Sequence, residues 1–236
     1  MIREAIILAG GLGTRLRSAV PDLPKSMAPV AGQPFLSYVI DHYRKEGIEK
    51  FILAVGYRSS AIEEWINTCY TDRGIKFEFS LETEPLETGG AIRLACRLAR
   101  DENILVLNGD TLFKVRLGPF TSFHEEHGSQ TTLALKPMHN FDRYGTVELN
   151  EDGSVERFSE KKFQQSGYIN GGVYLLRKDL FLAENLSEKF SFETDYLEKF
   201  FSQRKIFGFV QDQYFIDIGI PADYERAQAE LVINNG

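Results

Sequence analysis

A short apolar run followed directly by glycines constrains the fold of this chain more than any other segment. Residues 5–9 read Ala-Ile-Ile-Leu-Ala, which is typical of a buried strand. Gly10, Gly11 and Gly13 follow at once, and glycine lets the backbone turn sharply and approach a ligand closely. Successive bare N–H groups in such a turn can bind an anion. We therefore expect a strand that ends in a loop able to hold a polyphosphate.

Two cationic side chains follow the glycines. Arg15 stands beside the loop, and Lys25 lies between Pro24 and Ser26. A dinucleotide-binding loop is excluded, because its third glycine would stand where this chain has Leu16. A Walker A loop is excluded too, because the chain contains no Gly-Lys pair. The remaining alternative is a tight turn with a surface arginine, which the later lysine disfavours.

Helix and strand signals alternate along the first half of the chain. This order is typical of a mostly parallel sheet with helices on both faces, so we expect an α/β fold. From residue 131 onward, strand signals come in quick succession and predict a smaller β-rich insertion. Expected helices cover 35–46, 60–69, 88–100, 178–183, 192–201 and 221–232. Expected strands cover 51–55, 75–81, 104–107, 131–135, 145–149, 155–159 and 171–176.

Composition excludes several classes of protein. The net charge is −7 and no basic run occurs, which argues against nucleic-acid binding but not against a phosphorylated substrate. No stretch approaches the roughly 20 apolar residues that span a membrane, so we expect a cytoplasmic protein. Cys69 and Cys96 form no disulfide framework, and both are expected to be buried. His124 and His127 lack metal-site spacing and are expected on a solvated helix face.

Two aspartates stand where strands are expected to end. Asp110 follows the run Ile104–Leu107, and Asp217 follows Tyr214–Ile216 and precedes a helix. Ligands of open α/β sheets bind at such strand ends. Mg²⁺ takes one or two carboxylates together with phosphate oxygens and water. We therefore expect Asp110 and Asp217 to hold Mg²⁺, and turn or N-cap roles are the alternative.

Residues 8–30 resemble the signature of the sugar-1-phosphate nucleotidyltransferases. Gly-Gly-x-Gly-Thr-Arg-Leu ends at Leu16, and Pro-Lys-x-Met-x-Pro-Val ends at Val30, while Ser18-Ala19-Val20 departs from the usual spacer. The resemblance implies a Rossmann-like nucleotidyltransferase fold over residues 1–236 as a single domain. Its nucleotide-binding half would cover about 1–112, and its sugar-binding and metal-completing half about 113–236.

The resemblance also implies roles for individual residues. Arg15 and Lys25 would be catalytic, and Asp110 and Asp217 would bind the metal. Lys162 stands where the family's Glu-Lys-Pro motif has proline. The nucleotide would contact Leu8, Ala9, Gly10, Gly11, Gly13, Thr14, Glu82, Pro85, Thr88, Gly89 and Asn108. The sugar phosphate would contact Tyr144, Gly145, Glu160, Lys161, Asn170 and Gly171.

Several of these residues have simpler explanations. Tyr144 could be a packing aromatic, and the pair Glu160–Lys161 could be a solvated charge run. Asn170-Gly171 has an amide that can bond vicinal hydroxyls, yet Asn-Gly is also a strong turn signal. Both interpretations of Asn170 stay open at this stage.

Glu82 and Glu87 bear on the nucleotide base, and the later motifs bear on the sugar. The Glu82 carboxylate could accept from the two adjacent donors of guanine, although it could also be an exposed charge. The motifs resemble most closely the guanylyltransferases that act on a heptose 1-phosphate. Mannose 1-phosphate stays open, and Glu87 keeps UTP open because uridylyltransferases carry Leu-Glu-Thr-Gly-Gly.

Two other functional classes also stay open. A glycosyltransferase would carry Asp-x-Asp, which Asp110-Thr111-Leu112 lacks. A non-catalytic nucleotide or sugar sensor would be expected to lose its charged groups, and these are present. We therefore expect small-molecule partners, an NTP and a sugar 1-phosphate, while a homo-oligomer is neither indicated nor excluded.

Overall fold

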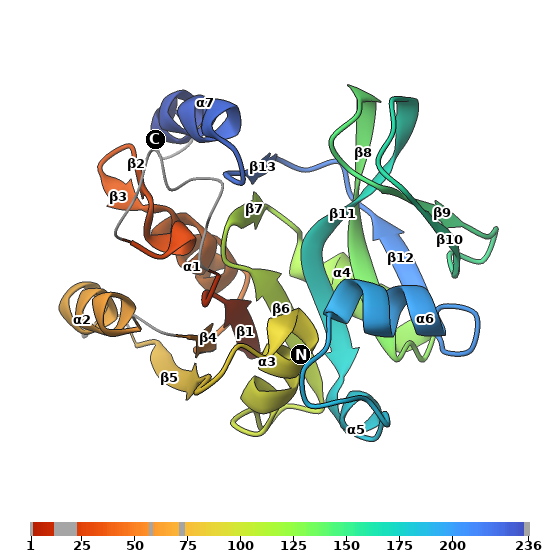
Figure 1. Cartoon of the computed structure of the whole chain (residues 1–236), viewed down its shortest axis with the longest axis horizontal. Coiled ribbons are helices and arrows are strands. Elements are labelled where there is room, and N and C mark those ends of the chain that lie inside the picture. Colours follow the sequence, from red (N-terminus) through yellow and green to blue (C-terminus); the bar gives the residue numbers. More distant parts are fainter. Residues whose placement is uncertain (1, 12–22, 57–58, 71–73, 234–236) are drawn as a thin grey trace.

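A central sheet organises the protein, as a computed structural model that describes residues 2–11, 23–56, 59–70 and 74–233 shows (Figure 1). The strand order is β10-β9-β11-β6-β1-β4-β5, and β8 pairs with β11 and β12. The parallel part consists of β1 (Glu4–Leu8), β4 (Lys50–Val55), β5 (Lys76–Leu81) and β6 (Asn103–Asn108).

Alternate residues of the parallel strands face two separate apolar cores. Ile7 and Leu53 belong to one core, and Ile6 and Ile52 belong to the other, as the two-residue period of a strand requires. The first core is covered by α1 (Phe35–Lys45), α2 (Ser60–Cys69), α4 (Leu117–Glu126) and α7 (Pro221–Ile233). The second is covered by α3 (Glu87–Cys96), α5 (Lys178–Leu182) and the π-helix η2 (Phe192–Leu197), which leads into α6 (Glu198–Phe200). The predicted α/β class is thus confirmed.

The second half of the chain extends this sheet with antiparallel strands. The long strand β11 runs antiparallel to β8 along most of its length. It also pairs antiparallel with β6 at its carboxyl-terminal end and with β9 at Ile169. A bulge between Asn170 and Tyr174 separates its two parts. The strands are β8 (Thr131–Phe141), β9 (Thr146–Leu149), β10 (Val155–Ser159), β11 (Gln164–Arg177) and β12 (Ile206–Val210).

Two short ribbons complete the fold. In one, β7 (Thr111–Phe113) pairs antiparallel with β13 (Phe215–Asp217), and the register sets Asp217 opposite Thr111. Because Thr111 follows Asp110, this pairing brings together two aspartates that lie far apart in the sequence. The other ribbon pairs β2 (Pro29–Val30) with β3 (Gln33–Pro34), just after the 3₁₀ turn η1 (Lys25–Met27).

Several sequence expectations need correction. The helix expected over 88–100 ends at Cys96, and Asn170-Gly171 lies within β11 rather than in a turn. Cys96 is buried as expected, but Cys69 is exposed. His124 is buried rather than on a solvated face, and its Nδ1 shares a 2.7 Å hydrogen bond with the Thr132 hydroxyl. Burial lowers the pKa of His124 to about 4. Among the described residues, no helix is long and apolar enough to cross a membrane.

Candidate active site

A lysine and two aspartates meet at the carboxyl ends of the central strands. The Lys25 ammonium donates a hydrogen bond to Asp110 Oδ2 and lies 3.9 Å from Asp217 Oδ1. Lys25 comes from η1, Asp110 from the turn after β6, and Asp217 from the end of β13. Gly219 also approaches closely: its N–H donates to Asp217 Oδ1 at 2.6 Å, and a Cβ on it would lie 3.2 Å from Lys25 Nζ. We call Lys25, Asp110 and Asp217 the charge cluster.

Asp217 is held in an environment that disfavours its negative charge. Burial, followed by the neighbouring charge of Asp110, raises the pKa of Asp217, although Lys25 acts in the opposite direction. The Tyr144 hydroxyl donates a long hydrogen bond of 3.4 Å to Asp217 Oδ2. Burial and the Asp217 charge raise the pKa of Tyr144 to about 12, so this phenol stays protonated near neutral pH. A cation bound at the cluster would relieve the repulsion between the two carboxylates.

The donor set suits a hard divalent cation. Within the described residues, no three histidine, cysteine or acidic side chains gather into a self-sufficient metal site. Two carboxylates are nevertheless what Mg²⁺ takes from a protein when phosphate oxygens and water complete its shell. The Lys25 ammonium already bonds one carboxylate and lies close to the other, which indicates that the position attracts positive charge.

A small cavity of about 180 Å³ lies on one side of the charge cluster. It opens beside the first strand and the first glycines that follow it, and Lys25 and Asp110 of the charge cluster are on its lining. Its lining is Leu8, Ala9, Gly11, Lys25, Ser26, Thr88, Asn108 and Asp110.

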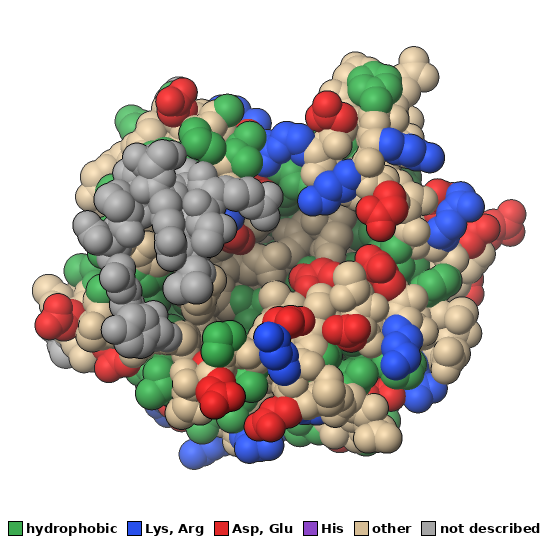
Figure 2. Space-filling view, in the orientation of Figure 1, with side chains coloured by type: hydrophobic (Ala, Val, Ile, Leu, Met, Phe, Trp, Pro, Cys, Tyr) green, Lys and Arg blue, Asp and Glu red, His purple; other side chains and the backbone are tan. Residues whose placement is uncertain are grey.

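A large cavity of about 680 Å³ lies on the other side and meets the small one at Asn108. Figure 2 shows this face hollowed, with acidic and basic side chains along the rim. The lining combines residues of β9, β10, β11 and the π-helix with residues from β6, β7, β13 and the connecting segments. Its polar side chains include Asn108, Thr111, Arg143, Tyr144, Thr146, Ser159, Glu160, Lys161, Asn170, Glu193, Glu198 and Asp217.

The lining of the large cavity is set by unusual backbone geometry. Gly172 has φ +70°, and a Cβ there would lie 2.7 Å from the Asn108 amide nitrogen. Its N–H donates to Asn170 Oδ1 at 3.1 Å, while Asn170 Nδ2 donates to the Tyr174 hydroxyl at 2.9 Å. The β11 bulge therefore holds the Asn170 amide in one orientation, and Asn170 lines the large cavity.

Some of the glycines expected to contact ligands also have packing reasons. A Cβ on Gly89 would lie 2.2 Å from the Phe190 ring, and one on Gly171 would lie 2.3 Å from Phe113. A Cβ on Gly145 would lie 2.6 Å from the Ser159 carbonyl oxygen. Close packing alone therefore requires glycine at these positions, and their contacts with nucleotide or sugar stay predictions.

Glu82 lies beside the glycine loop. A Cβ on Gly10 would come within 3.3 Å of Glu82 Oε1, and Glu82 Oε2 accepts the Leu86 N–H at 3.0 Å. Burial raises the pKa of Glu82. Oε2 of Glu82 is thus bonded to the backbone, while Oε1 lies near Gly10. Pro85 is exposed in the same turn.

The structure thus brings together most of the residues that the sequence singled out. Gly13, Thr14 and Arg15 lie outside the described residues. Sequence reasoning missed Gly219, Glu193 and Glu198. Gly219 could have been predicted as a site residue because it lies two positions after Asp217. The two glutamates could not, because the sequence predicts an ordinary α-helix around them.

A strand–glycine loop, a charge cluster at strand ends and two adjoining cavities define a nucleotide-transferring enzyme. The nucleotidyl transferase family profile matches residues 4–233, and the chain belongs to this family. It is 52% identical to the D-glycero-alpha-D-manno-heptose 1-phosphate guanylyltransferase of Aneurinibacillus thermoaerophilus, over 97% of this chain and 98% of that protein. It is 46% identical to the protein of the same name from Campylobacter jejuni, over 98% of this chain and 100% of that one.

The fold has a close counterpart among solved structures. HddC from Yersinia pseudotuberculosis, complexed with GMP-PN, superposes with a TM-score of 0.88 at 35% identity, covering 98% of this chain and 100% of that chain. The expected Rossmann-like nucleotidyltransferase fold is therefore confirmed.

Proposed function

We propose that the protein transfers a guanylyl group from GTP to D-glycero-α-D-manno-heptose 1-phosphate, giving GDP-heptose and pyrophosphate for surface polysaccharide synthesis. The observation that carries the proposal is the identity of 52% and 46% to two guanylyltransferases of that name over nearly their full lengths. The two cavities that meet at Asn108 support it, because the reaction needs adjoining sites for a nucleotide and a sugar phosphate.

The reaction needs alignment and charge neutralisation more than proton transfer. An oxygen of the sugar phosphate forms a bond to the α-phosphorus of GTP, and the bond from that phosphorus to the bridging oxygen of the β-phosphate breaks. Pyrophosphate leaves with the electron pair. Because the attacking oxygen is already an anion, no general base is required. Catalysis then consists of holding the reactants in line and stabilising charge, as in other phosphoryl transfers.

Each member of the charge cluster has a role in this proposal. Asp110 and Asp217 would hold Mg²⁺, which would neutralise phosphate charge when bound. Lys25 contacts the phosphates undergoing exchange, and its position between the small cavity and Asp217 supports this role. Arg15 braces the leaving pyrophosphate, a role that rests on the signature alone.

The remaining assignments follow the two cavities. The small cavity and the adjoining turn would take the nucleotide, with Leu8, Ala9, Gly11, Thr88 and Asn108 beside it. The large cavity would take the sugar phosphate, with Tyr144, Gly145, Glu160, Lys161, Asn170 and Gly171 on its lining. Glu82 would select guanine through its Oε1.

A substrate panel tests the proposal. GTP, ATP, UTP and CTP are each combined with heptose, mannose and glucose 1-phosphates, and pyrophosphate release is measured with Mg²⁺. GTP with the heptose 1-phosphate should give the highest kcat/KM. A higher value for mannose 1-phosphate, or for UTP, would replace the proposed substrate, and nucleotide binding without turnover on any sugar phosphate would indicate a sensor.

The catalytic roles need a separate test. Lys25→Met should lower kcat by roughly 10²–10³, the usual cost of removing a preorganised charge. Arg15→Ala should lower it to a similar degree. Wild-type turnover in either folded variant would remove that residue from the mechanism.

A further inference from the structure

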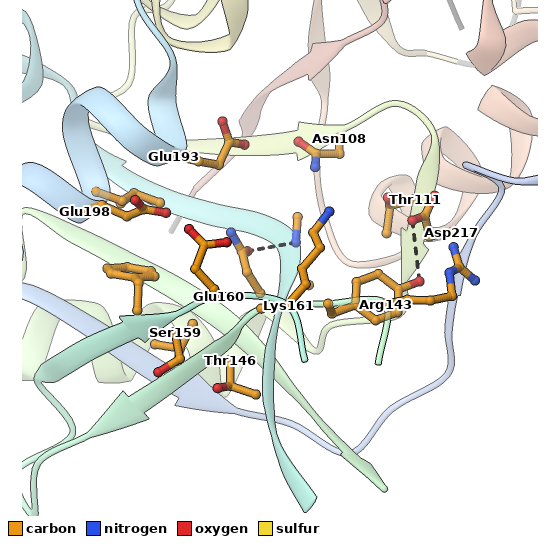
Figure 3. A pocket seen from close by; sticks show the side chains of 18 of the residues that line it. Asn108, Thr111, Arg143, Thr146, Ser159, Glu160, Lys161, Glu193, Glu198 and Asp217 are labelled. Carbon is orange, nitrogen blue, oxygen red and sulfur yellow. Dashed lines mark hydrogen bonds between the residues drawn. The ribbon is translucent and has the colours of Figure 1, made fainter. Parts of the chain in front are cut away.

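A π-turn separates two glutamates that line the large cavity. The π-helix η2 runs from Phe192 to Leu197, and the Glu198 N–H donates to the Glu193 carbonyl oxygen five residues earlier. In a regular α-helix, residues five apart point about 140° away from each other, given 3.6 residues per turn. A hydrogen bond between residues i and i+5 instead brings them one above the other. Glu193 and Glu198 therefore both face the large cavity (Figure 3).

The two carboxylates differ in what they bond. Glu193 Oε2 accepts from the Thr88 hydroxyl at 2.7 Å and from the Ser191 hydroxyl at 3.3 Å. Glu198, by contrast, has no hydrogen bond or ion pair through its side chain within the described part of the chain. Although the Glu198 side chain is exposed, partial burial of its carboxyl raises its pKa, and the charges of Glu160 and Glu193 add to this effect. The acceptor oxygens of Glu198 are thus free for a ligand.

Carboxylates gathered on one wall favour a ligand that offers hydrogen-bond donors. An ionised carboxylate only accepts hydrogen bonds, and sugar hydroxyls donate them. Glu160, from the segment after β10, lies near Glu198 in the same part of the cavity (Figure 3), so a hydroxyl-bearing group between them could donate to both. A ligand bound there would screen the repulsion between these side chains.

The position of Glu198 indicates which part of a sugar it would meet. The phosphate at carbon 1 must lie at the charge cluster, next to Asp217 and Thr111. Figure 3 shows Glu198 and Ser159 at the opposite end of the cavity from these two residues. In a sugar phosphate bound this way, the atoms remote from carbon 1 would extend toward the end of the cavity that Glu198 lines.

We propose that Glu198 is a specificity-determining residue that accepts hydrogen bonds from the exocyclic carbon chain of the heptose. A heptopyranose carries hydroxyls at carbons 6 and 7 of this chain, whereas a hexopyranose carries only the one at carbon 6. Glu198 then favours a seven-carbon over a six-carbon sugar phosphate. This inference rests on the function proposed above and names the residue that chooses its sugar.

The test compares selectivity between two sugar phosphates. For wild type, Glu198→Ala and Glu198→Gln, kcat and KM are measured with heptose 1-phosphate and with mannose 1-phosphate at saturating GTP. The ratio of the two kcat/KM values should fall roughly tenfold or more in Glu198→Ala, the size expected for a lost hydrogen bond to a charged group. The change should appear mainly in KM for the heptose substrate. Glu198→Gln keeps an acceptor and should lose less.

A matched control separates recognition from a change of charge. Glu151 is exposed in the turn between β9 and β10 and lies outside the cavity lining, so Glu151→Gln should leave the ratio unchanged. An unchanged ratio in Glu198→Ala, or equal KM increases for both sugars, would overturn the inference while leaving the proposed function intact. A wild-type enzyme with no preference for heptose would overturn both.

Discussion

The Thr88 hydroxyl joins α3 to the π-helix and so connects the two cavities. It donates to Glu193 Oε2 at 2.7 Å and accepts the Phe192 N–H at 2.8 Å. Thr88 also lines the small cavity, and Glu193 lines the large one. Thr88→Val keeps the shape of the side chain and removes both hydrogen bonds. We expect this substitution to destabilise the protein and to weaken sugar-phosphate binding.

The magnitude follows from the two bonds. A hydrogen bond to a charged group contributes about 1.5–3 kcal/mol, and an orphaned buried N–H costs about 1–3 kcal/mol. Thr88 and Glu193 are only partly buried, so water can replace some of the loss, and the lower end of each range applies. The free energy of unfolding should therefore fall by about 2–3 kcal/mol.

Urea unfolding followed by circular dichroism measures this loss. Thr88→Ser is the matched control, since it keeps the hydroxyl and removes one methyl group, worth roughly 0.8 kcal/mol. In kinetic assays the KM for the sugar phosphate should rise more than the KM for GTP, because Glu193 loses the shorter of its two hydroxyl hydrogen bonds. The reasoning would be refuted if Thr88→Val lowered the free energy of unfolding by less than about 0.5 kcal/mol, which is the usual range of surface substitutions. It would also be refuted if Thr88→Val and Thr88→Ser lowered it equally.

Three further substitutions test other parts of the structure. In Asp217→Asn, transfer should fall by roughly 10²–10³, while the free energy of unfolding at neutral pH in EDTA should rise by about 0.5–2 kcal/mol. The sign follows from the raised pKa of Asp217, because the ionised carboxylate is less favourable in the folded state than in the unfolded state. The gain in stability should vanish as the pH falls below the pKa of an aspartate in the unfolded chain, and urea titrations at several pH values would measure this. Gly171→Ala should lower the unfolding midpoint at a cost of about 1–3 kcal/mol, because its Cβ would lie 2.3 Å from Phe113. Gly118→Ala meets nothing within 4 Å on α4 and should instead raise stability by about 0.4–1 kcal/mol, so equal effects at the two glycines would contradict the packing argument.

Local patterns predicted the parallel half of the fold because three of its strands are continuous apolar runs and the fourth, β5, alternates polar and apolar residues. β1, β4 and β6 are buried on both faces and therefore appear in the sequence without polar interruptions. The antiparallel half was predicted less completely. β11 begins at Gln164, whereas the sequence predicted a strand only from Gly171. The earlier residues were not predicted as strand because they are largely polar and many of them are exposed. Their strand conformation comes from pairing with β8, which no local pattern reveals.

In the candidate site, too, local motifs could be predicted from the sequence, and long-range contacts could not. Lys25, Asp110 and Asp217 could be chosen from the sequence because each follows or precedes a recognisable motif. Their convergence depends on the pairing of β7 with β13, a contact between distant segments. Glu193 and Glu198 could not be assigned to one face, because the sequence predicts an α-helix over 192–201, and in an α-helix they would point apart.

The bulge in β11 has an evolutionary consequence. On one side of it the strand is anchored to β6 beside the charge cluster, and on the other it belongs to the hairpins that line the large cavity. Mutations on the amino-terminal side of the bulge can therefore reshape the large cavity while the charge cluster stays unaltered. Relatives that share this fold can diverge in the one part while selection on turnover preserves the other.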